Sequence, residues 1–331
     1  MVLVTGATGL VGSFLLLELS KRGKQIRAIR RKETSTDAVR KLFQEFSNLE
    51  QFEEIEWVEA DLLDVPSLEK ALKAIETIYH TAAFVSFDAR LNREIYNANV
   101  KGTRQLVNVA IPEKTPNIVY VSSIATLDIG EDESVINETS HWNPEAVHSY
   151  YARSKKSAEM EVWRAAEESG MKVLVVKPSV IIGTIDGKRY SENIFKTASR
   201  KTAFASEGIT GYVDVRDVVF SMVELVEKGN WNQSYILNAG EKSFFEVIAF
   251  VRKQWNLKNP VKVSKPMLRF LKNISLVNRI FGGTYLSKAS YEALTEESHF
   301  SNQKVVDAIG VKFIPINESL AFHAKRYLKM K

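Results

Sequence analysis

A glycine-rich turn directly behind the first apolar segment constrains the fold of this chain more than any other feature. Residues 5–12 read Thr-Gly-Ala-Thr-Gly-Leu-Val-Gly, after the apolar run Val2–Val4 and at the start of the amphipathic stretch Leu10–Arg22. A strand, a tight glycine turn and a helix form a unit that binds the pyrophosphate of a dinucleotide, because backbone N–H groups at the helix N-terminus carry partial positive charge. The sequence therefore predicts a dinucleotide site formed by Gly6, Thr8, Gly9, Leu10, Val11 and Gly12.

Strand-like and helix-like segments alternate over the first 180 residues, which predicts βαβ units and a parallel sheet with helices on both faces. The predicted strands are Val2–Val4, Ile26–Ile29, Ile55–Val58, Thr77–His80, Ile118–Val121 and Val173–Val176. The predicted helices include Ser67–Ala74, Asn92–Ala110, Tyr150–Ser169 and, later in the chain, Val213–Lys228. We expect an α/β fold with a doubly wound Rossmann sheet in residues 1–178, to which residues 205–237 return. Residues 179–204 and 238–331 would form a smaller, mostly helical substrate-binding lobe.

The composition excludes several kinds of chemistry. The chain has no cysteine, which rules out disulfides, thiolate nucleophiles and cysteine metal sites, and its five histidines lack the spacing of metal ligands. No apolar run approaches the roughly 20 residues that span a bilayer, so we expect a soluble, cytoplasmic protein without an integral membrane segment. The net charge of +5 comes with no nucleic-acid-binding motif, so we expect no nucleic-acid partner.

Positive charge is concentrated in one segment near the C-terminus. Residues 251–290 hold nine Lys and Arg and no Asp or Glu. A solvated basic face is the simplest interpretation, and attraction to an anionic substrate or to a membrane surface are the alternatives. The apolar stretch Met267–Leu286 within it is interpreted as a core helix of the smaller lobe or as the lining of a pocket for a lipophilic substrate.

The ends of the predicted strands should meet the ligand, since ligands of open parallel sheets bind beyond the carboxyl ends of the strands. Arg30 and Arg31 follow the second strand, where an acidic residue would bind the ribose of NAD and a basic residue suits the 2′-phosphate of NADP. We therefore favour NADP(H) over NAD(H), with plain surface charge as the alternative. Further cofactor contacts are expected at Asp61, Leu62, Ala82 and Ala83.

Serine, tyrosine and lysine side chains are the candidates for proton chemistry. The fifth strand ends in Ser122 and Ser123, and Tyr151 and Lys155 lie four residues apart on a predicted helix, hence on one helix face. A free tyrosine has a pKa near 10, and a neighbouring ammonium together with an oxidised nicotinamide favours the phenolate. Tyr151 and Lys155 are therefore a candidate acid–base pair beside one of the two serines, whose alternative role is to cap a turn.

In combination these motifs resemble the extended branch of the short-chain dehydrogenase/reductase family over nearly the whole chain. The resemblance rests on the Gly-x-x-Gly-x-x-Gly loop at Thr5–Gly12, Asp61, Asn99–Thr103, the two serines, Tyr151 and Lys155, Lys177–Ser179, Val215–Asp217 and a late Ile309–Leu320 stretch. It implies a homodimer formed through the helices 92–110 and 150–169.

The resemblance also implies roles for single residues. Tyr151 would be the general acid/base, Lys155 would hold the nicotinamide ribose and lower the tyrosine pKa, and Ser123 would hydrogen-bond the substrate oxygen. Asn99 would support Lys155 through a water relay. Pro178 would pack beside the nicotinamide, and Val180 is a further expected cofactor contact.

Within this branch the residues favour a reductase acting on a small molecule. Dehydratases carry carboxylates directly after the active serine or threonine, and Ile124 and Ala125 stand there instead. The chain is similar to dihydroflavonol-4-reductase-like and 3β-hydroxysteroid-dehydrogenase-like members, which implies hydride transfer between a nicotinamide and a carbonyl or secondary alcohol. A sugar-nucleotide epimerase with tightly bound NAD is the first alternative, and a non-catalytic NADP-sensing or binding module is the second.

Overall fold

The central sheet consists of seven parallel strands, five from the first half of the chain and two from the second. The structure, a computed structural model, describes residues 1–130, 134–187, 192–272 and 288–330 of the 331-residue chain. The strands of the sheet are β1 (Val2–Thr5), β2 (Ile26–Arg30), β3 (Glu56–Glu59), β4 (Thr77–His80), β5 (Asn117–Val121), β6 (Lys172–Pro178) and β10 (Gln233–Leu237). They are ordered β10-β6-β5-β4-β1-β2-β3, so the order reverses between β4 and β1. Ligands of such sheets bind at this reversal, beyond the carboxyl ends of the strands.

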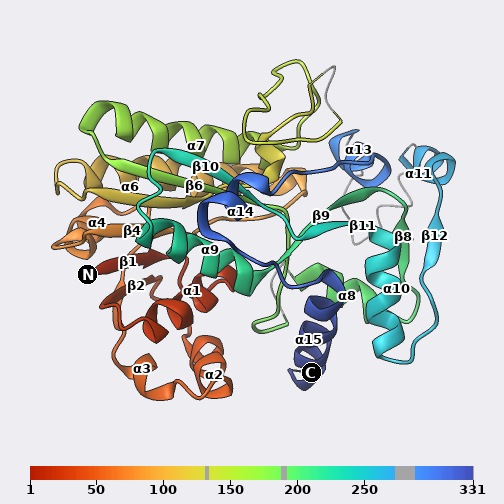
Figure 1. Ribbon diagram of the computed structural model, residues 1–331, viewed down its shortest axis with the longest axis horizontal. Coiled ribbons are helices and arrows are strands. Elements are labelled where there is room, and N and C mark those ends of the chain that lie inside the picture. The colour runs from red at the N-terminus through yellow and green to blue at the C-terminus, as the bar shows by residue number, and fades with distance from the viewer. Residues whose placement is uncertain (131–133, 188–191, 273–287, 331) are drawn as a thin grey trace.

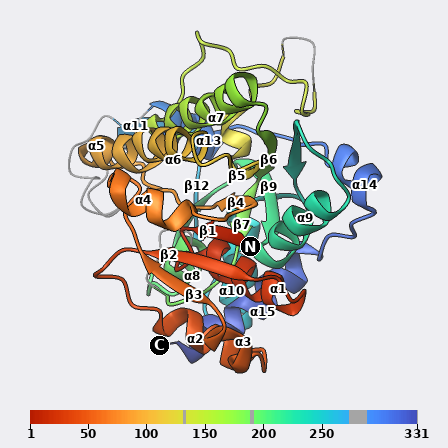
Figure 2. The same ribbon diagram turned by 90° about the vertical axis from the view of Figure 1, so that its left-hand side faces the viewer.

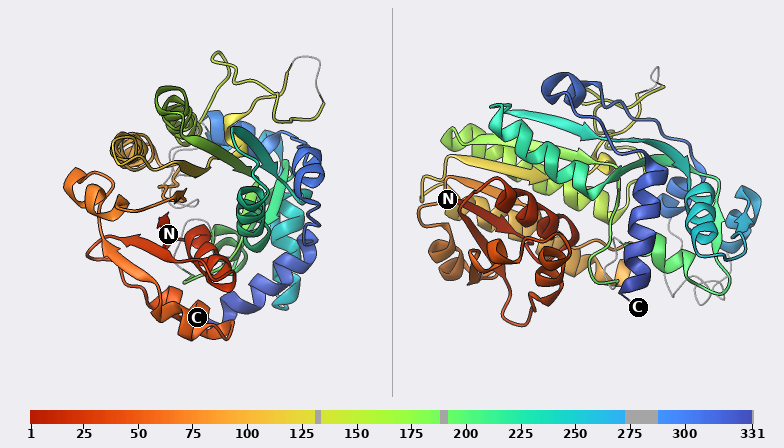
Figure 3. Two further views of the ribbon diagram at one scale, coloured as in Figure 1. Left: turned by 60° about the vertical axis from the view of Figure 1, so that its left-hand side comes forward. Right: turned by 60° about the horizontal axis from the view of Figure 1, so that its bottom comes forward.

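Helices cover both faces of the sheet (Figure 1), and Figures 2 and 3 show the same layers from other sides. The helices of these layers are α1 (Leu10–Lys21), α2 (Asp37–Glu45), α3 (Leu49–Glu53), α4 (Val65–Leu72), α5 (Asn92–Ile95), α6 (Gly102–Ala110), α7 (Tyr150–Ser169), α9 (Val215–Glu227) and α14 (Gln303–Ile309). Side chains of one strand alternate between the two cores: Val119 faces the core of α1 and α9, whereas Ile118 and Tyr120 face the core of α4, α6 and α7. Burial on both faces explains why the inner strands β1, β5 and β6 are largely apolar.

A smaller lobe follows the sheet at the carboxyl ends of its strands (Figure 1). Its strands are β7 (Val180–Ile182), β9 (Ile209–Asp214) and β11 (Gly240–Ser243) in one sheet, and β8 (Phe204–Ser206) and β12 (Val261–Val263) in another. Its helices are α8 (Asn193–Ala198), α10 (Phe244–Gln254), α11 (Lys265–Lys272), α13 (Lys288–Thr295) and α15 (Ile316–Lys329). A core of its own, around Phe195, Tyr212 and Leu320, holds this lobe together.

The predicted Rossmann fold is confirmed, and the differences lie in short or irregular segments. Helix α7 has the predicted bounds, because Ser149 caps its first turn and Gly170 ends it with a left-handed backbone (φ 71°). The helix predicted at residues 67–74 instead begins at Val65, since a proline fits the first turn, and it ends before Ala74, whose φ is 60°. The helix predicted from Val213 begins only at Val215, because β9 continues to Asp214.

The strands of the smaller lobe are missing from the prediction. β7, β8 and β12 are three residues long, which is too short for an alternating pattern to stand out. The basic segment 251–290 is described only up to residue 272 and from 288 onward, so most of the apolar stretch 267–286 lies outside the described residues. Its described beginning is helix α11.

Polar side chains connect the C-terminal helix α15 to the rest of the molecule. The buried carboxylate of Asp214 accepts hydrogen bonds from Arg216 Nη2 (2.7 Å) and from Ser319 Oγ of α15 (2.6 Å). Arg326 of α15 forms an ion pair with Glu45 of α2, with Nη2 2.8 Å from Oε2. These contacts fix α15 against the Rossmann part of the chain.

Asp217 makes the stability of the protein depend on pH. Burial raises the pKa of this carboxyl to about 7, against a hydrogen bond from the Ile314 N–H (2.8 Å) that lowers it. The fold therefore holds a proton that the unfolded chain releases above pH 4, so stability from this group is lost as pH rises from about 4 to 7. The loss is at most about 1.4 kcal/mol per pH unit.

An Asp217→Asn variant should lose less stability than wild type between pH 4 and 7, because it has no carboxyl that must release a proton. Urea unfolding at a series of pH values measures this loss. Parallel pH profiles of the two proteins would contradict the prediction.

Candidate active site

The glycine turn after β1 has the geometry of a close backbone approach. Gly6 has φ of +65°, and a Cβ placed there would lie 2.6 Å from the Ala82 nitrogen at the end of β4. A Cβ on Gly12 would lie 2.2 Å from the Gly6 oxygen, which in turn accepts a 2.8 Å hydrogen bond from the Gly9 N–H. Only glycine fits at Gly6 and Gly12, because any side chain would push the turn apart.

Helix α1 begins directly after this turn, and its N-terminus can bind an anion. Gly9 is its N-cap residue, no side chain of the described part of the chain caps it, and its first turn carries no acidic residue. The backbone N–H groups at this end and the helix dipole therefore favour a negative charge such as a pyrophosphate. Leu10 is buried against Gly183 of the smaller lobe, and Val11 is partly buried, so these two residues would offer backbone groups. The turn thus fits a dinucleotide.

A chain of hydrogen bonds fixes the ends of β1 and β4 next to each other. The Thr5 hydroxyl lies 2.7 Å from His80 Nδ1, and the Thr103 hydroxyl lies 2.8 Å from His80 Nε2. Thr81 Oγ1 donates to the Thr5 carbonyl (2.7 Å). Burial lowers the pKa of His80 to about 3, so the ring stays neutral and acts as a structural link. Sequence reasoning missed this role of His80, although it is the last residue of a predicted strand.

The two arginines after β2 differ in their surroundings. Arg30 Nη2 forms an ion pair with Glu59 Oε1 on the neighbouring strand β3 (2.8 Å). Arg31 is exposed, and its guanidinium has no ion-pair partner in the part of the chain that the structure describes. Arg31 is therefore the freer of the two cations for a ligand phosphate.

The remaining predicted cofactor contacts lie at the carboxyl edge of the sheet as expected from their strands. Asp61 is exposed and its Oδ1 accepts from the Leu63 N–H (2.8 Å), while Leu62 packs against Gly102 of α6. Ala82 and Ala83 follow β4, Pro178 ends β6 and Val180 begins β7. Their contact with a cofactor stays a prediction.

Tyr151, Lys155 and Ser123 come together between α7 and the end of β5. Lys155 points into the protein, where its Nζ donates to the Val121 carbonyl (2.5 Å) and lies 4.3 Å from the centre of the Tyr120 ring. The side chain of Ser123 lies near that of Tyr151 and lowers the pKa of its phenol. The one-turn spacing on α7 and the strand end of β5 therefore place a hydroxyl, a phenol and an ammonium in one cluster.

The electrostatics of this cluster keep the proton on the tyrosine. Burial raises the pKa of Tyr151 to about 12, while the nearby Ser123 side chain acts in the opposite direction. Burial lowers the pKa of Lys155 to about 7; Glu159 raises it and Lys177 lowers it further. At neutral pH the protein alone therefore presents a protonated phenol, which is the state of a proton donor.

The structure separates the two candidate serines. Ser122 is buried and its Oγ donates to Glu159 Oε2 (2.5 Å). Ser123 is partly exposed, and its Oγ accepts from the Ala125 N–H (3.2 Å), which leaves its own proton for another acceptor. Ser123 is therefore the serine placed to meet a ligand.

Asn99 lies in an irregular turn of its helix. The predicted helix 92–110 contains a π-helical segment, η2 (Tyr96–Lys101), between α5 and α6, and such segments often occur at functional sites. The Asn99 side chain bonds the Phe84 N–H (2.7 Å) and the Ser154 hydroxyl (2.9 Å). It thus links the loop after β4 to α7, and its support of Lys155 stays a prediction.

Two exposed aromatic side chains of the loop after β4 were missed by sequence reasoning, and one of them contacts the tyrosine. Phe87 packs edge-on against the Tyr151 ring with the ring centres 5.9 Å apart, and it is 41% exposed. Phe84, in the same loop, is 38% exposed. The exposed Phe87 therefore offers an apolar surface directly beside Tyr151.

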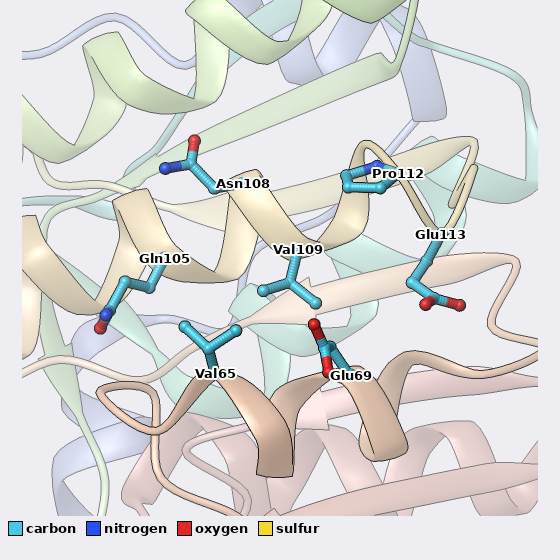
Figure 4. A pocket seen from close by; sticks show the side chains of 7 residues that line it. All are labelled: Val65, Glu69, Gln105, Asn108, Val109, Pro112 and Glu113. Atoms are coloured by element: carbon cyan, nitrogen blue, oxygen red, sulfur yellow. The ribbon is translucent and has the colours of Figure 1, made fainter.

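A surface pocket of about 320 Å³ lies away from this cluster, between α4 and α6 (Figure 4). It is lined by Val65, Glu69, Gln105, Asn108, Val109, Pro112 and Glu113. None of the predicted site residues lines it, so the pocket is separate from the cluster of Ser123, Tyr151 and Lys155.

Comparison with known proteins agrees with this geometry. The sequence profile of the NAD dependent epimerase/dehydratase family matches residues 2–240. The chain belongs to this family. Its members form the extended branch of the short-chain dehydrogenases/reductases, whose Rossmann fold and nicotinamide dinucleotide the chain therefore shares. Among the described residues, every helix is too short or too polar to span a bilayer.

Individual members of the family show moderate similarity over most of the chain. Sterol demethylase protein B from Methylococcus capsulatus is 28% identical over 279 residues, 83% of this chain and 80% of that protein. Cinnamoyl-CoA reductase 1 from Petunia hybrida is 26% identical and covers 96% of this chain and 89% of its own. The crystal structure of gox2253 superposes with a TM-score of 0.83 at 27% identity, covering 99% of this chain and 98% of the other.

Proposed function

We propose that the protein is an NADPH-dependent reductase of an apolar ketone or aldehyde, or a dehydrogenase of the matching alcohol. The observation that carries the proposal is the cluster of Ser123, Tyr151 and Lys155 at the carboxyl edge of the sheet, with a phenol that keeps its proton at neutral pH. A reductase needs a proton donor there. A family relative named as a reductase, cinnamoyl-CoA reductase 1, supports the same choice.

The glycine turn, the N-terminus of α1 and Arg31 are the parts that would hold the dinucleotide. Residues 1–178 and 205–237, apart from β8 and β9, would supply this site, and residues 179–204 and 238–331, apart from α14, would close over the substrate with β8 and β9. When bound, the nicotinamide supplies or accepts a hydride. Lys155, whose Nζ lies against the Tyr120 ring, would orient the ribose.

The reduction then needs two groups of the protein at the carbonyl oxygen. Tyr151 would donate the proton to this oxygen, because it is the protonated group in the cluster. Ser123 would donate a hydrogen bond to the same oxygen and so stabilise the negative charge that develops on it. Phe84 and Phe87 would contact an apolar group next to the carbonyl.

Cofactor preference tests the role of Arg31. An Arg31→Ala variant should bind NADPH about tenfold more weakly, because it loses a charge-assisted contact with the 2′-phosphate, while NADH affinity stays the same. Arg30→Ala is the matched control with a smaller expected effect, because Arg30 is already paired with Glu59. Titration of each variant with NADPH and NADH gives the dissociation constants. Equal affinity of wild type for both nucleotides would contradict the NADP assignment.

Turnover of a panel of substrates tests the reaction. Purified protein should oxidise NADPH in the presence of apolar ketones or aldehydes. Tightly held NAD(H) that resists dialysis, together with turnover of sugar nucleotides only, would instead indicate an epimerase.

A further inference from the structure

Four polar side chains that the proposed reaction does not use form a buried cluster behind Ser123. They are Ser122 after β5, Thr126 in the short helix η3 (Ile124–Thr126), Glu159 on α7 and Lys177 on β6. Lys177 Nζ lies 2.5 and 2.6 Å from the two oxygens of Glu159 and donates to Thr126 Oγ1 (2.9 Å). Ser122 Oγ donates to the same carboxylate (2.5 Å).

The ion pair in this cluster is an unusual choice for stability alone. Glu159 is 5% exposed and Lys177 is 2% exposed, so both charges have lost their hydration. Buried ion pairs often contribute no more stability than apolar side chains of similar volume. A second role, in fixing the geometry of something nearby, would explain the pair better.

The cluster forms hydrogen bonds with the chain on both sides of Ser123. Ser122 is tied to Glu159, and Thr126 Oγ1 donates to the Ser123 carbonyl oxygen (2.8 Å) while it accepts from Lys177. The backbone of Ser123 is extended (φ −163°, ψ 151°), and its side chain acts on the phenol of Tyr151 on α7. Glu159 lies two helical turns beyond Tyr151 on that same helix. Through Ser122 and Thr126, the ion pair therefore connects α7, which carries the proposed proton donor, to the segment around Ser123.

We propose that Glu159 and Lys177 are positioning residues that hold the Ser123 hydroxyl against Tyr151. The inference rests on the proposed function for its consequence in turnover, and on geometry alone for the position of the serine. Removing the pair should leave a folded protein whose Ser123 no longer reaches Tyr151 reliably. Displacement of a catalytic hydrogen-bond donor lowers the rate even when the donor is still present.

The principal test is the double variant Glu159→Leu/Lys177→Met. It removes both charges at similar volume, and because the two charges shift the Lys155 pKa in opposite directions, it leaves that pKa less disturbed than either single change. We expect kcat to fall about tenfold or more, with the dissociation constant for NADPH within about twofold of wild type. A folded double variant with wild-type kcat would overturn the proposal.

Two further variants keep the test decisive. Thr126→Val, which deletes only the hydroxyl between Lys177 and the Ser123 carbonyl, serves if the double variant does not fold; it too should lower kcat, and unchanged kcat would overturn the proposal. Glu161→Gln is the control, because Glu161 is an ion-paired carboxylate on the same helix that contacts Arg104 (2.7 Å) and Arg164 (2.9 Å) instead. It should keep wild-type kcat.

A cycle with Ser123→Ala shows whether the pair acts through the serine. In that background Glu159→Leu/Lys177→Met should cause almost no further loss, because residues that act as a unit are not additive. A full additional tenfold loss would overturn the proposal.

A crystal structure of the double variant gives a readout that does not depend on turnover. The Ser123 hydroxyl should have moved away from Tyr151, and an unchanged position would contradict the inference. If wild type reduces no carbonyl, the proposed function fails while this structural result still decides the positioning role.

Discussion

Replacing Tyr151 by phenylalanine should lower kcat for carbonyl reduction by about 10²- to 10⁴-fold, the range in which a positioned proton donor contributes. The phenol is the group of the cluster that burial keeps protonated, with a pKa of about 12. Phenylalanine keeps the ring and its edge-on contact with Phe87, so the fold should be preserved. The rate is measured as NADPH oxidation under saturating substrate.

The control for this variant is cofactor affinity. The glycine turn and Arg31 belong to the β1–α1 turn and the segment after β2, not to α7, so NADPH should bind to Tyr151→Phe within about twofold of wild type. Loss of binding together with loss of turnover would point to misfolding. Wild-type turnover with intact binding would remove Tyr151 from the mechanism.

Replacing Gly12 by alanine should abolish dinucleotide binding. The added Cβ would lie 2.2 Å from the Gly6 oxygen and 2.8 Å from the Ala7 Cα, both backbone atoms that cannot swing aside. To relieve the clash, the turn must open, and its N–H groups then no longer converge on an anion. We expect the dissociation constant for NADPH to rise at least 100-fold, about 2.7 kcal/mol of binding free energy.

A second glycine separates this effect from ordinary strain. Gly229 follows α9 with φ of +73°, and a Cβ there would meet nothing within 4 Å. Gly229→Ala should therefore lower stability by about 1 kcal/mol through its left-handed backbone and leave NADPH affinity unchanged. If Gly12→Ala bound NADPH like Gly229→Ala, the glycine turn would not be the pyrophosphate site.

The sequence predicted the parts of the molecule that are set by local pattern. The glycine turn, the apolar strands and the spacing of Tyr151 and Lys155 are local, and each lies in the expected element. The choice of Ser123 over Ser122 followed from a resemblance and stays a prediction; in the structure Ser122 is bonded to Glu159.

What the sequence could not predict depends on contacts between distant segments. Glu159 and Lys177 are 18 residues apart, and no periodicity indicates that a helix and a strand bring them together. The π-helical segment around Asn99 could not be predicted either, because the helical sequence pattern continues through it without a break. Phe87 is far from Tyr151 in the chain and was missed for the same reason.

The transfer of deuterium from NADPH to the product distinguishes a carbonyl reductase from an epimerase. Wild-type protein would be incubated with NADPH deuterated at C4 of the nicotinamide on either face, together with the best apolar ketone or aldehyde from the panel. A carbonyl reductase should place one deuterium on the carbinol carbon of the product from one of the two labelled NADPH stereoisomers. One NADP⁺ should form for each alcohol. Absence of label from the product, with sugar nucleotides interconverted on a tightly held NAD, would contradict it.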